Sequence, residues 1–281
     1  MTLAMAADEH LRDPRRAATL LRAALAHDMG LPVLASRLAG QVLAEAPACH
    51  WAALLAAEAD ASPEARRRLL LAMGDNGGAA AAAIRAAVLL QEGRCEKAAE
   101  VYCAAAIAMS DAPDLLLKQA VALEQAGHTR RALEIYLRLR QSPDARVAAT
   151  ASNNAAYLTA EFFPNDAEKL RQAHQWAGEA VRIAPAMATF RDTKGWLAHL
   201  LGDGDEARRE LRLAVKAQPD RWEIHEHLAA AEEAAGHAEL AGWHRQAARR
   251  LRQAQGGRGA PAGEGRPAAP AEHAAAAAAA S

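Results

Sequence analysis

A ten-residue segment of the chain recurs 34 residues further on. Residues 93–102 read GRCEKAAEVY and residues 127–136 read GHTRRALEIY, so a glycine, an alanine and a tyrosine return at the same spacing. The glycine-to-alanine step reappears at 202–207 and 236–241, again 34 residues apart. A fixed period of this length indicates a repeat architecture, in which each unit is one supersecondary element stacked on its neighbours.

Seven units of this kind account for most of the chain. Two divergent units occupy 16–78, and five regular units occupy 79–112, 113–146, 147–187, 188–221 and 222–253. A leader segment at 1–15 precedes them. The segment 254–281 consists mainly of Gly, Pro and Ala without a periodic apolar face, which predicts a flexible tail because it cannot bury enough surface to offset the entropy of ordering.

Each unit is predicted to form two helices. In the fourth unit, apolar residues recur at helical spacing, Gly127 ends the first helix in the left-handed region, and the second helix ends before Pro143. Small residues such as Ala120 and Ala132 recur in every unit where two antiparallel helices would cross closely. The fifth unit has a surplus of residues, mostly around EFFPND at 161–166.

Composition supports an all-α fold and excludes several classes of protein. Aromatic residues make up 4% of the chain, and alanine, leucine, arginine and glutamate are common. The formal net charge of -1, from 33 basic and 34 acidic residues, indicates no general attraction to nucleic acid or anionic membrane. Asp8 and Glu9 interrupt the place where a signal peptide needs an apolar run, so we expect a cytoplasmic protein without membrane insertion.

No motif for catalysis or for a cofactor is found in the sequence. Phosphate-binding glycine loops, the H-E-x-x-H zinc motif and the G-x-S-x-G nucleophile elbow are all missing, which predicts that the chain is not an enzyme. The three cysteines do not form a C-x-x-C pair, and we expect no metal or cofactor. His225 and His227 are two residues apart on one helix, so they point in different directions and are expected to be ordinary groove or interface histidines.

The units resemble tetratricopeptide repeats. The small residue of the first helix, the turn glycine, the alanine that opens the second helix and the closing proline all fit that pattern. The stretches NNAAYL (153–158) and RDTKGWL (191–197) further resemble a bacterial variety with successive Asn-Asn-x-Ala-Tyr and Asp-Thr-x-Gly-Trp units, although Lys194 stands where a leucine is usual. The resemblance implies a right-handed superhelical solenoid of about seven antiparallel helix pairs, whose first helices line a concave groove.

The same resemblance implies that one face of the first helices meets a partner. In the fifth to seventh units this face carries Asn153, Tyr157, Thr189, Asp192, Trp196, His199, Glu223, Glu226 and Glu233. The stripe runs from an amide through two aromatics to acid, which suits a protein or an extended peptide, and the glutamates favour a basic segment in that partner. The alternative for Tyr157 and Trp196 is that they only pack between neighbouring first helices.

The expected function is therefore a non-catalytic adaptor or scaffold. Chaperone-binding members use a two-carboxylate clamp, of which Asn154 alone is present here. Leucine, valine or threonine stands at the other places, namely Leu117, Val121, Thr189 and Thr193, so an Hsp70/Hsp90-type C-terminus is not an expected partner. The likeness of NNAAYL and DTKGW leaves open a second interpretation, an accessory subunit of an envelope polysaccharide or glycosyl-transfer system. The basic run HRQAARRLR at 244–252 is expected to cap the last unit.

Overall fold

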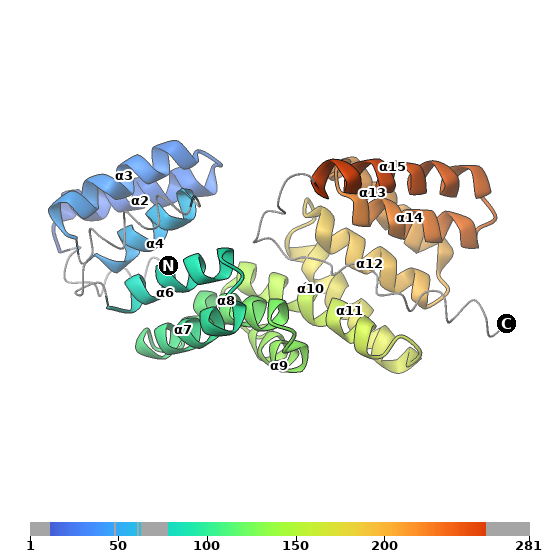
Figure 1. The fold of residues 1–281 in the computed structure, drawn as a ribbon, viewed down its shortest axis with the longest axis horizontal. Helices are drawn as coiled ribbons and strands as arrows, with labels where there is room; N and C mark the ends of the chain where they lie inside the picture. The colour runs from blue at the N-terminus through green and yellow to red at the C-terminus, as the bar shows by residue number, and fades with distance from the viewer. Residues whose placement is uncertain (1–11, 48, 61, 63–77, 257–281) are drawn as a thin grey trace. The chain divides into compact units, whose positions relative to one another are not determined.

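The computed structural model describes residues 12–47, 49–60, 62 and 78–256, and the regular secondary structure of these residues is entirely α-helical (Figure 1). In the order of the predicted units, the first helices are α2 (Pro14–Asp28), α4 (His50–Ala59), α6 (Gly78–Gln91), α8 (Pro113–Gln125), α10 (Ala145–Phe162), α12 (Ala188–Leu200) and α14 (Trp222–Ala234). The second helices are α3 (Pro32–Glu45), α7 (Cys95–Ala108), α9 (Thr129–Leu139), α11 (Ala167–Ile183), α13 (Gly204–Ala217) and α15 (Ala238–Gly256). The all-α prediction is confirmed for the described part of the chain.

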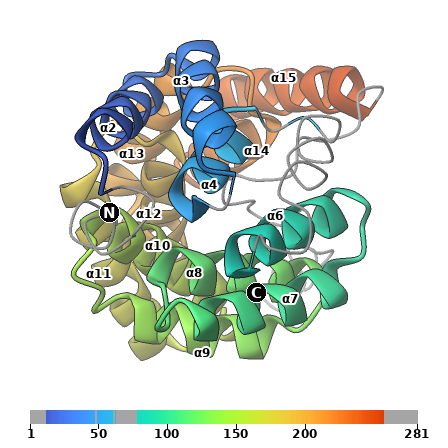
Figure 2. The same ribbon diagram turned by 90° about the vertical axis from the view of Figure 1, so that its left-hand side faces the viewer.

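The helices pack mainly against their neighbours in the chain. Consecutive helices such as α10 and α11, α12 and α13, and α14 and α15 pack against each other, and α14 and α15 run side by side in both views (Figure 1, Figure 2). The second helix that the sequence predicts after α4 lies outside the described residues, as do most of the leader and the tail. At the other end, α15 continues to Gly256, beyond the point where the tail was expected to begin.

The turn glycines have the backbone conformation that the sequence predicts. Gly127 follows α8 with φ 83°, in the left-handed region that side chains with a Cβ rarely adopt. Its N–H donates to the carbonyl of Glu124 at 3.0 Å, and the N–H of His128 donates to that of Leu123 at 2.8 Å. These two bonds form a Schellman motif, which ends the helix and satisfies its last carbonyl groups.

Small residues lie where the paired helices cross. Ala120 of α8 and Ala132 of α9 are both fully buried. In α12 the position is taken by Gly195, where an added Cβ would lie 2.7 Å from Cγ of Leu211 in α13. The helices therefore approach each other too closely for a larger side chain at this crossing.

The surplus residues of the fifth unit lengthen its helices. α10 and α11 contain 18 and 17 residues, whereas α12 and α13 of the next unit contain 13 and 14. The segment 163–166 between α10 and α11 remains short. The extra length is therefore mostly helical, and only part of it falls within EFFPND, where the sequence placed most of it.

The chain divides into two compact units between residues 132 and 133. In the second of these, α12 contacts both α10 and α14, while α11 packs against α10 and α12, and α13 packs against α12 and α14. The three first helices of this unit therefore form a continuous layer. We use the name first-helix face for the side of this layer on which the sequence predicts Asn153, Trp196 and Glu226 to lie.

Candidate functional site

The centre of the first-helix face is a cluster of three rings. The ring centroid of Trp196 lies 5.1 Å from that of His199, one turn further along α12, and 4.5 Å from that of His227 in α14, and both pairs are stacked. Trp196 and His199 belong to the predicted site, whereas the sequence predicts His227 only as an ordinary groove or interface histidine. His227 follows Glu223 by four residues, so the same-face spacing that selected Glu223 would also have selected it. We call these three rings the aromatic cluster.

A buried ion pair holds the His227 ring of the aromatic cluster against α12. Nδ1 of His227 lies 2.8 Å from Oδ1 of Asp192, and both side chains are almost completely buried. Burial alone would lower the pKa of His227, but the charge of Asp192 and its hydrogen bond, with smaller contributions from Glu226 and Glu223, raise it above its ordinary value. His227 is therefore stabilised as an imidazolium beside the indole ring of Trp196, an arrangement that also favours a cation–π interaction.

The pKa of His199 shifts in the opposite direction from that of His227. Its burial, and then the positive charge on His227, lower the pKa of its ring. The indole of Trp196 therefore contacts one imidazole that favours the charged form and one that favours the neutral form. Trp196 itself is only partly buried.

The predicted residues of α10 are buried. Tyr157 has 9% of its surface exposed, and its hydroxyl donates to Oε1 of Glu161 at 2.8 Å. Nδ2 of Asn153 donates to Oδ1 of Asn154 at 3.2 Å. Oδ1 of Asn153 is also buried, and no residue in the described part of the chain donates a hydrogen bond to it. Trp196 is thus the more accessible of the two predicted aromatics, and Asn153 has an unused acceptor.

The acidic end of the stripe already has arginine counter-ions. Oε1 of Glu226 lies 3.9 Å from Nη1 of Arg252, and Glu233 pairs with Arg245. Partial burial is the largest cause that raises the pKa of Glu226. The basic run that the sequence assigned to capping therefore also supplies charges to α14.

Thr189 and Glu223 complete the predicted set, and both are buried. The carbonyl of Thr189 accepts a hydrogen bond from the hydroxyl of Thr193 at 3.1 Å. Oε2 of Glu223 lies 3.9 Å from Nε of Arg221. The structure thus brings Asp192, Trp196 and His199 together in one cluster, while the other predicted residues make separate local contacts.

Lys194, the position that departs from the repeat pattern, enters an ionic network between α12 and α13. Its Nζ lies 2.9 Å from Oε1 of Glu206 and 3.3 Å from Oε1 of Glu210. Arg191 donates to Oε2 of Glu210 at 2.7 Å. Burial opposes ionisation of Glu210, but Arg191 and Lys194 lower its pKa overall. Charge pairing therefore replaces the apolar contact that a leucine would make.

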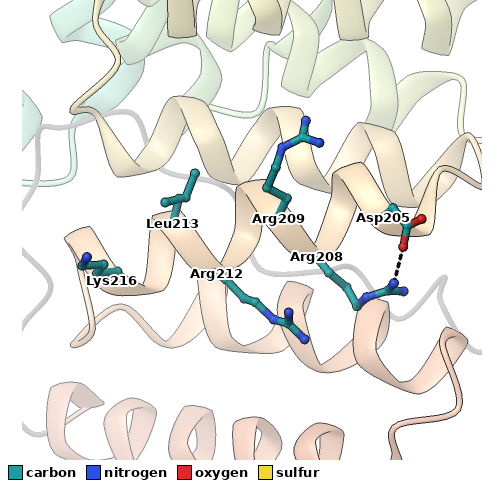
Figure 3. Close-up of a pocket in the computed structure, with 6 residues that line it drawn as sticks. All are labelled: Asp205, Arg208, Arg209, Arg212, Leu213 and Lys216. Atoms are coloured by element: carbon teal, nitrogen blue, oxygen red, sulfur yellow. Dashed lines mark hydrogen bonds and ion pairs between the residues drawn. The ribbon is translucent and has the colours of Figure 1, made fainter.

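The side of α13 shown in Figure 3 carries a shallow basic pocket. Its lining side chains are Asp205, Arg208, Arg209, Arg212, Leu213 and Lys216. The three arginines already have partners, since Arg208 pairs with Asp205, Arg209 with Glu206, and Arg212 with buried Glu232. This surface lies on a second helix and contributes nothing to the aromatic cluster.

Within the described residues, no three or more histidine, cysteine or acidic side chains are arranged to hold a metal ion. Among the same residues, no helix is both long enough and apolar enough to cross a membrane.

Comparisons with known proteins place the fold. Neither a protein-family model nor a curated protein matches the chain. Among solved structures, MamA (residue 41 to the end) from Desulfovibrio magneticus RS-1 is similar with a TM-score of 0.51 and 20% identity, covering 65% of this chain and 98% of that one. TTC0263, a thermophilic TPR protein of Thermus thermophilus, is similar with a TM-score of 0.53 and 21% identity, over 64% of this chain and 98% of that one. The chain therefore has the fold of tetratricopeptide-repeat proteins.

Proposed function

We propose that the chain is a non-catalytic adaptor that binds an extended segment of a partner protein on the first-helix face. The observation that carries this proposal is where the buried polar side chains lie. Among the described residues, every buried polar or charged side chain except Glu210 belongs to a first helix. They are Gln119, Ser152, Asn153, Asn154, Thr159, Thr189, Asp192, Thr193, Glu223, His225, His227 and Glu232, of which His225 and Glu232 pair with residues outside the first helices.

The concentration of buried polar side chains on the first helices reduces the stability of the fold. A buried polar group is less favourable than an apolar one unless its hydrogen bonds are complete, so a layer built only for stability would carry apolar side chains instead. The second helices resemble a layer built only for stability, since their buried side chains are mostly alanine and leucine, as in α11 and α13. The polar layer on the first helices therefore supports a role in recognition.

Asn153 supplies a specific contact for the partner. Its buried Oδ1 lacks a donor among the described residues, and an unpaired buried acceptor costs about 1–3 kcal/mol. After a rotation of the Asn153 side chain that exposes Oδ1, a backbone N–H of an extended segment would satisfy it. Main-chain hydrogen bonds of this kind give affinity without demanding a particular side chain, which suits an adaptor.

Trp196 and the glutamates of α14 suggest which side chains the partner carries. The accessible part of Trp196 offers an apolar and aromatic contact, and Glu226 lies on the neighbouring helix with only a distant arginine partner. A lysine or arginine of the partner would contact the indole and displace Arg252 from Glu226. The proposed ligand is therefore an extended peptide with a basic residue beside a hydrophobic one.

The test is selection of binders from a display library of unstructured peptides on the full-length chain. Trp196→Ala and Asn153→Ala are the test variants, and Leu213→Ala in the basic pocket of α13 is the control, since Leu213 is an exposed apolar side chain. The Trp196→Ala variant should bind the selected peptides at least about 30-fold more weakly, as expected for loss of about 2 kcal/mol from an aromatic anchor. Circular dichroism and thermal melting establish that each variant is folded.

Two results would overturn the proposal. In one, the selected peptides bind the folded Trp196→Ala and Asn153→Ala variants as tightly as the unchanged chain. In the other, Leu213→Ala abolishes binding while both first-helix variants retain it, which would move the binding surface to the second helices.

A further inference from the structure

Two histidines of the last helix pair face each other through the same ring nitrogen. Nδ1 of His225, in the first turn of α14, lies 2.9 Å from Nδ1 of His244 in α15. His225 is buried and His244 is partly buried. The ring of Trp243 packs beside both, with centroid distances of 5.9 Å to His225 and 4.7 Å to His244. These residues lie apart from the aromatic cluster and have no part in the proposed peptide site.

The hydrogen bond at the second ring nitrogen of His225 determines its tautomer. Nε2 of His225 lies 3.1 Å from the backbone carbonyl of Pro219, which can only accept a hydrogen bond, so Nε2 carries the ring hydrogen. Nδ1 of a neutral His225 therefore presents a lone pair to His244. A metal-binding histidine typically donates its other ring N–H to a carbonyl or carboxylate in this way, which orients the ring.

The spacing of the two nitrogens matches one class of metal geometry. Two nitrogen ligands at a right angle around an ion, with bonds of about 2.0–2.1 Å, are separated by about 2.9 Å, whereas a tetrahedral angle would require about 3.3 Å. Right-angled nitrogen ligands are typical of tetragonal Ni²⁺ and Cu²⁺. We propose that His225 and His244 bind a tetragonal divalent cation of the Ni²⁺ or Cu²⁺ type, with water as the remaining ligands.

Proton balance allows this binding at neutral pH. Before the ion binds, His244 donates its Nδ1 hydrogen to the lone pair of His225. When the ion binds, the hydrogen of His244 moves to its Nε2, so both Nδ1 atoms can coordinate without loss of a proton. Near neutral pH the neutral form of an ordinary imidazole predominates, since its pKa is about 6.5.

Two further charged groups act on His244. Glu232 favours a positive charge there and Arg212 disfavours it, and these two side chains are paired with each other at 2.6 Å. Their effects on a bound cation therefore oppose each other. With only two protein ligands, the site should have moderate affinity, and its binding should weaken in acid as the imidazoles become protonated.

The experiment is calorimetric titration of the full-length chain with Ni²⁺ near neutral pH. Ni²⁺ is the better probe because Cu²⁺ oxidises accessible thiols, and Cys95 and Cys103 are both partly exposed. His225→Gln and His244→Gln should each weaken binding at least about tenfold, since loss of even an outer-sphere partner costs 10–100-fold. His128→Gln is the control, because His128 is a partly exposed histidine that pairs with Glu96 elsewhere in the chain. It should leave the affinity unchanged.

Trp243 reports where the ion binds. Its ring lies against both histidines, so Ni²⁺ should quench its fluorescence. Trp243→Phe should lose that quenching and keep the heat of binding. Binding should also raise the melting temperature of the unchanged chain and not that of His244→Gln, provided that circular dichroism finds the variant folded.

Three outcomes would overturn the proposal. The first is the lack of any saturable Ni²⁺ binding to the full-length chain, in which case the two histidines form only a hydrogen bond. The second is equal binding by the His225→Gln and His244→Gln variants and the unchanged chain. The third is loss of binding in His128→Gln to the same extent, which would assign the heat to scattered surface histidines.

Discussion

Gly195→Ala tests how closely α12 and α13 approach each other. A Cβ at this position would lie 2.7 Å from Cγ of Leu211, and 3.2 Å from both the Leu211 nitrogen and the Ala207 carbonyl oxygen. Non-bonded carbon atoms are normally about 3.5–4.0 Å apart. Leu211 is fully buried, so it has no free space into which it can move. The added methyl group must therefore push the two helices apart or force Leu211 into a poor rotamer.

The expected magnitude comes from two opposing effects. Alanine is more favourable than glycine inside a helix by about 1 kcal/mol, whereas overpacking a closely packed core costs about 1–3 kcal/mol or more. Two of the three close contacts at Gly195 are with backbone atoms, which cannot rotate away. We therefore expect overpacking to dominate and the free energy of unfolding to fall by about 1–2 kcal/mol.

Gly178→Ala is the matched control. Gly178 also lies inside a helix, α11, but an added Cβ there would meet no atom within 4 Å. Only the helix-forming gain remains, so the free energy of unfolding should rise by about 0.5–1 kcal/mol. Urea unfolding followed by circular dichroism measures both variants. If Gly195→Ala is as stable as the unchanged chain, with the same dependence on urea, the close crossing of α12 and α13 is refuted.

Three further predictions concern buried groups. Ala132→Leu should lower the free energy of unfolding by about 1–3 kcal/mol, because Ala132 is fully buried and a larger side chain would overpack its surroundings; unchanged urea unfolding would contradict this. The pKa of His227 is raised in the folded state, so its contribution to stability is complete below the ordinary pKa of 6.5 and is lost as the pH rises through the folded-state pKa. Asp192→Asn should therefore reduce the loss of stability at alkaline pH, measured by urea titrations at several pH values. Burial opposes ionisation of Glu232, but His237 and Arg212 lower its pKa overall, so its contribution is present above 4.5 and lost in acid; Glu232→Gln should flatten the acid limb of the same curves.

The helices could be predicted from the sequence because their limits depend on local chemistry. Gly127 ends α8 by its own left-handed backbone, and Asp144 caps α10 by accepting from the N–H groups of Arg146 and Val147. Such signals act over a few residues and recur with the period. The small residues at the helix crossings recur for the same reason, which is why the pairing of the helices was also predictable.

The chemistry of the first-helix face was less predictable because it depends on pairs of side chains from different helices. Asp192 and His227 are separated by 35 residues, and only the packing of α12 on α14 brings them to 2.8 Å. Lys194 departs from the repeat pattern, which the sequence alone shows. Its ion-pair partners Glu206 and Glu210 lie on the next helix, so the pairing could not be predicted. The repeat period locates a face of a helix, whereas the rotamers that decide which charges meet depend on both helices at once.

Among the described residues, the contact between α4 and α6 is made mainly by alanine. Its buried residues are Ala53, Ala57, Ala81 and Ile84, with partly buried Leu43 packed against them. An alanine side chain buries far less apolar area than a leucine, so this cluster contributes little hydrophobic free energy. In a repeat array each unit is stabilised mainly by its neighbours, and opening starts where an interface is weakest. The amide hydrogens of α2, α3 and α4 should therefore exchange with deuterium as one block, earlier than those of α10 to α14.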